Sequence, residues 1–251
     1  MADNVIVVTG PERIAGELPL PEGFALRSYA TVTHFATRLI NDRPVMVILM
    51  GSAAMSKSLT VAAKASPATR RIPIVVIVPA EAARADMLTS GADFALVSDE
   101  VEEKLPGIIT KHARVPDPAR EERLDCECRD TLPPLAVQGV EKFNNREFYP
   151  QHDLFEEQWV ATEGPVRDLY RAVLQVGVAY YQIERGNHRG ALKMLLRAVQ
   201  WLEVLPDVCQ TIDVAQLKTD AYAVRAELER MNPDDIAQFD RTLLKPVSRV
   251  T

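Results

Sequence analysis

Cysteine is scarce in this chain, and long apolar runs are absent. Three cysteines in 251 residues are too few for the disulfide framework of a small secreted protein, and they fit a reducing compartment. The longest apolar runs are far shorter than the roughly 20 residues of a membrane-spanning helix. The amino-terminal sequence MADNVIVVTG also lacks the basic segment of a signal peptide. These absences predict a cytoplasmic protein without a membrane-spanning segment.

Basic residues are not in excess either. The chain has 29 Lys and Arg against 35 Asp and Glu, which gives a formal net charge of −6. Because nucleic-acid-binding proteins usually carry a basic face, we expect no nucleic-acid partner. The sequence also contains no glycine-rich phosphate loop, no zinc-type CxxC pair and no nucleophile elbow. No reaction class is indicated, and a non-enzymatic role is favoured over an enzymatic one.

The first half of the chain alternates short apolar runs with helical segments. The runs are rich in β-branched residues and apolar on both faces, as strands buried in a parallel sheet are. They lie at residues 4–8, 44–50, 72–78 and 94–97, and a weaker strand is expected at 25–29. Helices are expected at 53–65, 81–90 and 100–112. This alternation predicts an α/β domain of flavodoxin-like type with a parallel sheet.

The second half is helical, with Gly, Asn and Pro between the segments. Helices are expected at 135–144, 149–162, 166–185, 188–205, 214–231 and 234–244. Short loops between helices of this length predict antiparallel neighbours in an all-α bundle. A charged, proline-flanked stretch between the halves is typical of a linker, although its AREERL segment is long enough for one short helix. We predict an α/β domain at 1–115, a linker at 116–133 and a helical bundle at 134–251.

The first half resembles a response-regulator receiver domain. The resemblance rests on the order and spacing of the strands and on the stretch IPIVVIVPAEAARADMLTSGADFALV at residues 72–97. In active receivers, an acid pair after the first strand holds magnesium and an aspartate at the end of the third strand accepts the phosphoryl group. A hydroxyl ends the fourth strand and a lysine ends the fifth. The metal and the lysine neutralise charge on the transferred group.

This sequence departs from the receiver pattern at each of those positions. The corresponding residues carry neither a carboxylate nor an amine; in chain order they are Thr9, Gly10, Met50, Pro79 and Ser98. Residues 43–80 contain no Asp or Glu, so a shift of the alignment by one residue changes nothing. We predict a degenerate receiver that cannot be phosphorylated. A generic flavodoxin-like domain without signalling ancestry is the alternative.

The second half resembles the bacterial helical family catalogued as domain of unknown function 309, over roughly residues 135–230. The motif of that family is a helix with the pattern His-Glu-x-x-Glu-x-x-Trp, and the matching stretch here is NNREFYPQHDLFEEQW. The motif falls on His152, Asp153, Glu156 and Trp159, with Asp153 in place of the usual Glu. Gln175 in the following helix matches as well. The family has no established activity, so the resemblance implies a fold and not a function.

His152, Glu156 and Trp159 lie at i, i+4 and i+7, so they share one face of the predicted helix. An imidazole and a carboxylate directed into an apolar bundle need partners. We favour a buried polar network that also includes Asp153 and Gln175. One alternative is a divalent-metal site with His152 and Glu156 as ligands, which would suit a metal-binding protein or a metal-dependent hydrolase. A polar pocket for a small ligand is another.

Cys126 and Cys128 form a CxC pair in the predicted linker. Two thiolates can bind a soft metal or oxidise, but a single pair is weak evidence for either role. Cys209 is expected to pack as a small hydrophobic residue or to lie in a loop. Apart from the alternative metal site, no cofactor and no catalytic residue is indicated. We therefore expect a regulatory or interaction protein that associates with a protein partner or with itself.

Overall fold

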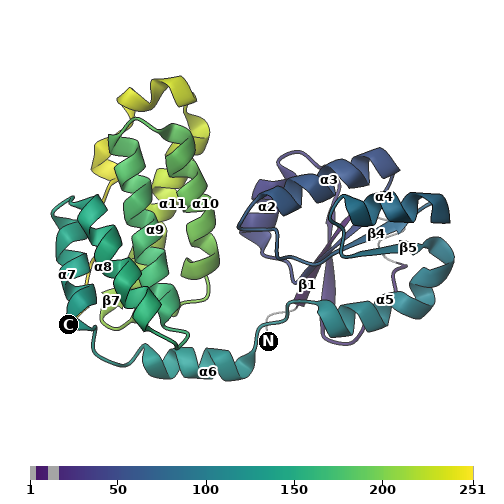
Figure 1. Cartoon of the computed structure of the whole chain (residues 1–251), viewed down its shortest axis with the longest axis horizontal. Coiled ribbons are helices and arrows are strands. Elements are labelled where there is room, and N and C mark those ends of the chain that lie inside the picture. Colours follow the sequence, from purple (N-terminus) through teal and green to yellow (C-terminus); the bar gives the residue numbers. More distant parts are fainter. Residues whose placement is uncertain (1–3, 11–16, 251) are drawn as a thin grey trace. The chain divides into compact units, whose positions relative to one another are not determined.

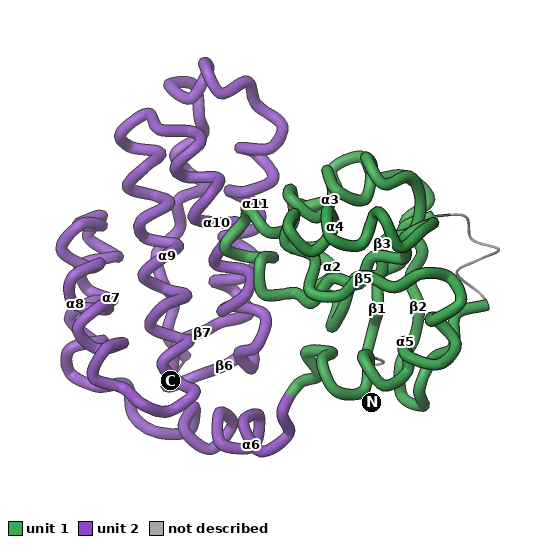
Figure 2. The backbone as a smooth tube through the Cα atoms, turned by 45° about the vertical axis from the view of Figure 1, so that its right-hand side comes forward, with its two compact units in different colours: residues 1–116 green, residues 117–251 purple. Residues whose placement is uncertain are grey.

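The computed structural model describes residues 4–10 and 17–250, which form two compact units (Figure 2). Unit 1 spans Met1–Pro116 and unit 2 spans Asp117–Thr251. Each unit has hydrophobic core clusters of its own, as expected of a domain. The boundary lies in the proline-containing stretch between the two halves of the sequence.

Unit 1 is built on a five-stranded parallel sheet. Its strands are β1 (Asn4–Thr9), β2 (Phe24–Tyr29), β3 (Met46–Met50), β4 (Ile74–Val78) and β5 (Phe94–Val97). Their order across the sheet is β2-β1-β3-β4-β5, and every neighbouring pair is parallel. This is the doubly wound order of flavodoxin-like folds, so the predicted fold class of the first half is confirmed.

Different helices cover the two faces of this sheet (Figure 1). The first face packs against α2 (Phe35–Asp42), α3 (Ala53–Ala65) and α4 (Arg84–Thr89), which follows the 3-10 turn η1 (Glu81–Ala83). The second face packs against α5 (Ser98–His112). In β3, Val47 and Leu49 belong to the first core and Ile48 and Met50 to the second. Because both faces of β3 are buried, this strand is a continuous apolar run in the sequence.

Unit 2 is helical apart from a short antiparallel hairpin of β6 (Val208–Cys209) and β7 (Ile212–Asp213). Its helices are α6 (Pro118–Glu127), α7 (Pro134–Asn144), α8 (Phe148–Ala161), α9 (Arg167–Glu184), α10 (His188–Leu202) and α11 (Val214–Arg230). The helical class predicted for the second half is confirmed. Among the described residues, no helix of either unit combines the length and the apolar character that a membrane crossing requires.

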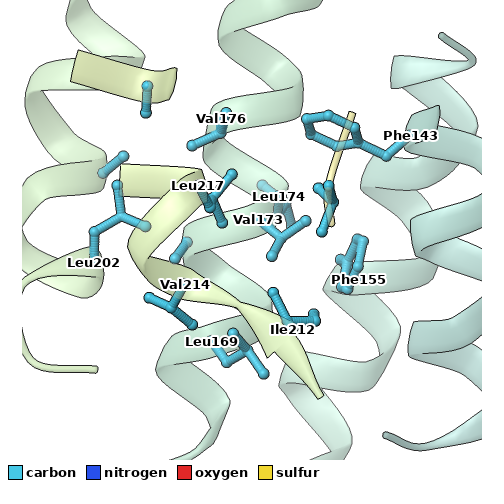
Figure 3. Close-up of a cluster of buried hydrophobic side chains, with 14 of the residues drawn as sticks. Phe143, Phe155, Leu169, Val173, Leu174, Val176, Leu202, Ile212, Val214 and Leu217 are labelled. Atoms are coloured by element: carbon cyan, nitrogen blue, oxygen red, sulfur yellow. The ribbon is translucent and has the colours of Figure 1, made fainter. Parts of the chain in front are cut away.

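Helix α9 is the central element of unit 2. It packs against both α8 and α10, and most of its residues are buried. Leu169 and Val173 of α9 belong to one hydrophobic cluster with Phe143 of α7, Phe155 of α8 and Leu217 of α11 (Figure 3). A helix that is buried around most of its circumference needs neighbouring elements whose apolar side chains pack against each of its faces.

The segment predicted as a linker is a folded part of unit 2. It contains α6, which begins with the N-cap Asp117 and has Pro118 in its first turn. Leu124 is buried in the core of unit 2, and Arg120 forms an ion pair with Asp168 of α9. The short helix that AREERL could form is present, and the segment was assigned to a linker because most residues of α6 are charged or exposed. One buried leucine does not produce a visible helical period.

A disulfide joins Cys128, at the end of α6, to Cys209 of β6. Gln210 reinforces this junction: its backbone N–H donates to the carbonyl of Cys128 at 2.7 Å, and its side-chain oxygen accepts from the hydroxyl of Tyr170 at 2.7 Å. Cys209 packs in the hydrophobic core of unit 2, as expected, and its pairing with Cys128 was not predicted. The paired residues are 81 positions apart, so spacing does not reveal the pair. A reducing compartment consequently loses its support from the cysteine count.

The α-helix predicted at 234–244 is replaced by two 3-10 turns, η2 (Pro233–Gln238) and η3 (Arg241–Leu243). The carboxylate of Asp240 accepts the backbone N–H of Thr242 at 2.9 Å and starts the second turn. Side-chain bonds of this kind compete with continuous helix formation. The prediction of one helix is wrong because this local bond interrupts the segment, while Phe239 and Leu244 on either side of it reach the core.

Removing the disulfide is expected to destabilise unit 2. The bond closes a long loop and so restricts the unfolded chain. We expect Cys209→Ser to lower the free energy of unfolding by roughly 2–4 kcal/mol, measured by urea denaturation under non-reducing conditions. Cys126→Ser is the matched control, because Cys126 is exposed and unpaired. Equal stabilities of the two variants would contradict the disulfide.

Candidate functional site

Ligands of open α/β sheets bind beyond the carboxyl ends of the strands, so this edge is the first place to examine in unit 1. The residues at or just after the strand ends are Thr9, Gly10, Met50, Gly51, Pro79 and Ser98. None of them has a carboxylate or an amine. Residues 11–16, which follow β1, lie outside the described part of the chain.

The ends of β1 and β3 approach each other closely. Thr9 is fully buried, and its hydroxyl accepts the backbone N–H of Met50 at 3.4 Å. Gly10 has a φ of +132°, and a Cβ there would lie 3.0 Å from the Cβ of Met50. Gly51 has a φ of +145°, and a Cβ there would lie 2.3 Å from the Cε of Met55. Backbone and methionine side chains therefore pack closely at the ends of β1 and β3, and glycine is needed at both positions.

Two carboxylates beyond β4 and β5 are held in ion pairs. Arg84 pairs with Glu81 at 2.8 Å and with Glu100 at 2.6 Å, and Lys104 pairs with Glu100 at 2.5 Å. Hydrogen bonds from Lys104 and Arg84 lower the pKa of Glu100 to about 2. Glu100 thus stays charged and links α5 to α4.

In unit 2, the His–Glu face of α8 does not point into the bundle. The side chain of His152 is 31% exposed, and its Nδ1 lies 3.0 Å from Oδ1 of Asp153. Asp153 and Glu156 are exposed to solvent. The predicted buried network of these three residues is therefore wrong, because water can solvate both carboxylates.

The buried face of α8 is formed by Gln151 and Phe155, each of which precedes a residue of the His152–Glu156 pair by one position. Gln151 and Phe155 are fully buried, and glycines on the neighbouring helices make room for them. A Cβ on Gly139 of α7 would lie 2.7 Å from the ring of Phe155, and a Cβ on Gly177 of α9 would lie 2.3 Å from Nε2 of Gln151. The two glycines thus determine how α8 is rotated about its axis.

Trp159 packs across to α9 and not toward His152. The guanidinium carbon of Arg171 lies 4.4 Å from the ring centroid of Trp159 and 3.8 Å from that of Trp201 in α10. The guanidinium carbon of Arg167 lies 5.4 Å from the centroid of Trp159. Gln175 follows Arg171 by one helical turn and is buried. The structure therefore gathers Trp159 with arginines and a second tryptophan through cation–π contacts.

The predicted metal ligands do not form a complete site. Among residues 4–10 and 17–250, no group of three or more His, Cys, Asp or Glu side chains is placed to hold a metal ion. His152 and Glu156 supply two groups at the surface of α8, whereas protein zinc sites use three or four. The CxC pair cannot supply two thiolates while Cys128 is in the disulfide and Cys126 alone is free.

The Arg–Trp contacts were not predicted from the sequence. A usable signal was nevertheless present. The chain has only two tryptophans, and Arg167 and Arg171 are spaced i, i+4 in the helix between them. That spacing places both guanidinium groups on one face, where a neighbouring indole ring can meet them.

Residues 136–194 match the model of a family described as "Domain of unknown function (DUF309)". The match includes His152, Glu156, Trp159 and Gln175, and it supports the resemblance found in the second half of the sequence. No curated protein matches the chain. For unit 1, the parallel sheet is compatible with a receiver-like fold.

We expect the purified protein to retain no stoichiometric metal, because the described side chains offer two ligands at most. Elemental analysis after gel filtration, on the wild type and on His152→Ala, measures this. One metal ion per chain that is lost in a folded His152→Ala variant would contradict the expectation and would establish the metal-site alternative.

Proposed function

We propose that the protein is a non-enzymatic regulatory or interaction protein, in which unit 1 acts as a receiver-like domain that cannot be phosphorylated. The observation that carries the proposal is the close packing of Gly10 against Met50, where β1 and β3 end. Met50 occupies the position of a receiver's phospho-acceptor, and Gly10 packs against it. A methionine thioether cannot form an acyl phosphate.

The surroundings of Met50 support this proposal. No carboxylate occurs in residues 43–80, so a neighbouring acid cannot replace the missing acceptor. The hydroxyl of Thr9 is already bonded to the backbone of Met50. Pro79 and Ser98 stand where a receiver has its hydroxyl and its lysine. With the phosphoryl chemistry gone, the remaining role for the domain is binding, to a protein partner or to a second copy of the chain.

The metal-binding protein or metal-dependent hydrolase remains the second candidate. It is favoured by one observation: His152 and Glu156 lie one turn apart on the outer side of α8, where solvent ions can reach them. Asp153 adds a carboxylate beside the imidazole, and a hydrogen bond joins its Oδ1 to Nδ1 of His152. A working site would need a further ligand from outside this helix.

Acetyl phosphate with Mg²⁺ is expected to leave the protein unmodified, because the position at the end of β3 has no carboxylate. Intact-mass spectrometry of the treated chain measures this, with a phosphorylation-competent receiver as the positive control. A phosphoryl group that hydroxylamine removes would be an acyl phosphate and would overturn the proposal.

Association is expected at micromolar concentrations, and acetyl phosphate is expected not to change it. Sedimentation velocity over a dilution series of the full chain measures self-association. Crosslinking in cells of the source organism measures association with a partner. The proposal fails if the chain is monomeric at every concentration and no crosslinked partner is found.

A further inference from the structure

Helix α10 carries positive charge only. Its sequence, HRGALKMLLRAVQWL, contains Arg189, Lys193 and Arg197 and no Asp or Glu. The three residues follow one another at intervals of four, so they form a stripe along one helix face, which we call the basic stripe. Arg189 and Lys193 are exposed, and Arg197 is partly exposed. The chain as a whole has a formal net charge of −6, so the stripe is a local exception.

The basic stripe has no acidic partner. Among residues 4–10 and 17–250, none of its three side chains forms an ion pair or donates a hydrogen bond. Helix α3 also has lysines and no acid, but Lys57 pairs with Asp86 at 2.6 Å. Its second lysine, Lys64, pairs with Asp93 at 2.7 Å. Because like charges at i and i+4 destabilise a helix, the unpaired stripe lowers the stability of α10 unless an acidic surface covers it.

An apolar side chain lies on the same face as these cations. Leu196 stands at i+7 from Arg189 and at i+3 from Lys193, so it lies beside both on the helix. It is partly exposed and belongs to none of the hydrophobic clusters of the described residues. Leu195 and Leu202, by contrast, are buried in the core of unit 2. An apolar residue surrounded by polar ones is typical of a protein–protein contact.

A complementary surface is present on unit 1. Asp99, Glu102 and Glu103 of α5 are exposed, and within the described ranges none of them pairs with a cation. They lie at i, i+3 and i+4, which places them on one side of the helix, which we call the acidic face. Of the three, only Asp99 lies in the first turn, where the helix dipole stabilises a carboxylate. The dipole therefore does not account for Glu102 and Glu103.

The two surfaces match in spacing as well as in sign. Arg189 and Lys193 are separated by about 6 Å along the axis of α10, because an α-helix rises about 1.5 Å per residue. Asp99 and Glu103 are separated by about the same distance along α5. Two ion pairs can therefore form at once when these helices lie side by side.

We propose that the basic stripe of α10 in one copy of the chain docks on the acidic face of α5 in a second copy. Every copy carries both surfaces, so two copies can make the contact twice and close as a dimer. The inference rests on the proposed function and deepens it, because it names the surfaces through which the interaction protein associates with itself. The net negative charge of the chain disfavours a nucleic acid as the occupant.

Charge reversal on separate copies tests this contact. One variant of the full chain combines Arg189→Glu with Lys193→Glu, and the other combines Glu102→Lys with Glu103→Lys. We expect each variant alone to raise the dissociation constant of self-association roughly tenfold or more, because like charges then meet. An equimolar mixture of the two variants is expected to restore association, because each reversed surface meets an opposite charge on the other variant. Sedimentation velocity over a dilution series measures all of these samples.

The matched control combines Arg230→Glu with Arg241→Glu. It changes the net charge as much as reversal of the basic stripe does, but at exposed arginines of α11 and η3, and its association should equal that of the wild type. Added sodium chloride should weaken association of the wild type, because the contact is between exposed charges. If circular dichroism shows that the stripe variant does not fold, Arg189→Gln with Lys193→Gln takes its place, with weaker association expected.

Three outcomes would overturn this inference: a wild type that is monomeric at every concentration, a folded stripe variant that associates as the wild type does, and a mixture of variants that stays monomeric. A monomeric chain with a crosslinked partner in cells removes only the contact between copies and leaves the proposed function in place. A monomeric chain without any partner removes both. Self-association that ignores the stripe likewise removes the contact alone.

Discussion

The burial of α9 is the constraint on which the rest of unit 2 depends. Because most of its circumference is covered, each neighbouring element must match the part of α9 that it contacts. Gly177 admits the side chain of Gln151 and so determines the rotation of α8. Arg171 meets Trp159 and Trp201 between α8 and α10. Near the amino-terminal end of α9, Asp168 forms an ion pair with Arg120 of α6, and the hydroxyl of Tyr170 donates a hydrogen bond to Gln210 in the turn of the hairpin. The candidate sites of unit 2 are therefore consequences of how α9 is packed.

Much of the fold could be predicted from the sequence, because the distribution of apolar residues along the chain reflects which residues are buried. Most strands of unit 1 are continuous apolar runs, which made them visible, whereas β2 contains Arg27 and Ser28 and was expected only as a weaker strand. Helix α6 was foreseen only as a short helix that the AREERL segment could form, because its buried surface is mainly one leucine, Leu124. The carboxyl-terminal segment was predicted as one helix, although the carboxylate of Asp240 accepts the backbone N–H of Thr242 and starts a separate turn there. The spacing of apolar residues does not reveal such a local hydrogen bond.

The candidate site was harder to predict, because the spacing of residues along a helix does not determine which face of the helix points toward the core. Residues at i and i+4 share a face of a helix, but the spacing does not say whether that face is buried. His152 and Glu156 have this spacing, and so do Gln151 and Phe155. What distinguishes the two faces is the glycine on each facing helix, since only a residue without a Cβ admits Phe155 or Gln151 so closely. Glycines inside predicted helices would thus have been the better guide to the orientation of α8.

The edge of the sheet in unit 1 combines a flavodoxin-like strand order with strand ends, at Thr9 and Met50, that carry no carboxylate. Carboxylates gathered at one strand edge repel each other and must be desolvated, so such an arrangement is maintained only where function requires it. Here Gly10 and Met50 fill the space with backbone and apolar atoms, and Thr9 completes the packing with its hydroxyl. Met50 thereby joins the hydrophobic core, while Gly51, Pro79 and Ser98 at the neighbouring strand ends are exposed. Packing therefore accounts for the residue at the end of β3, and solvent accounts for the polar or small residues around it.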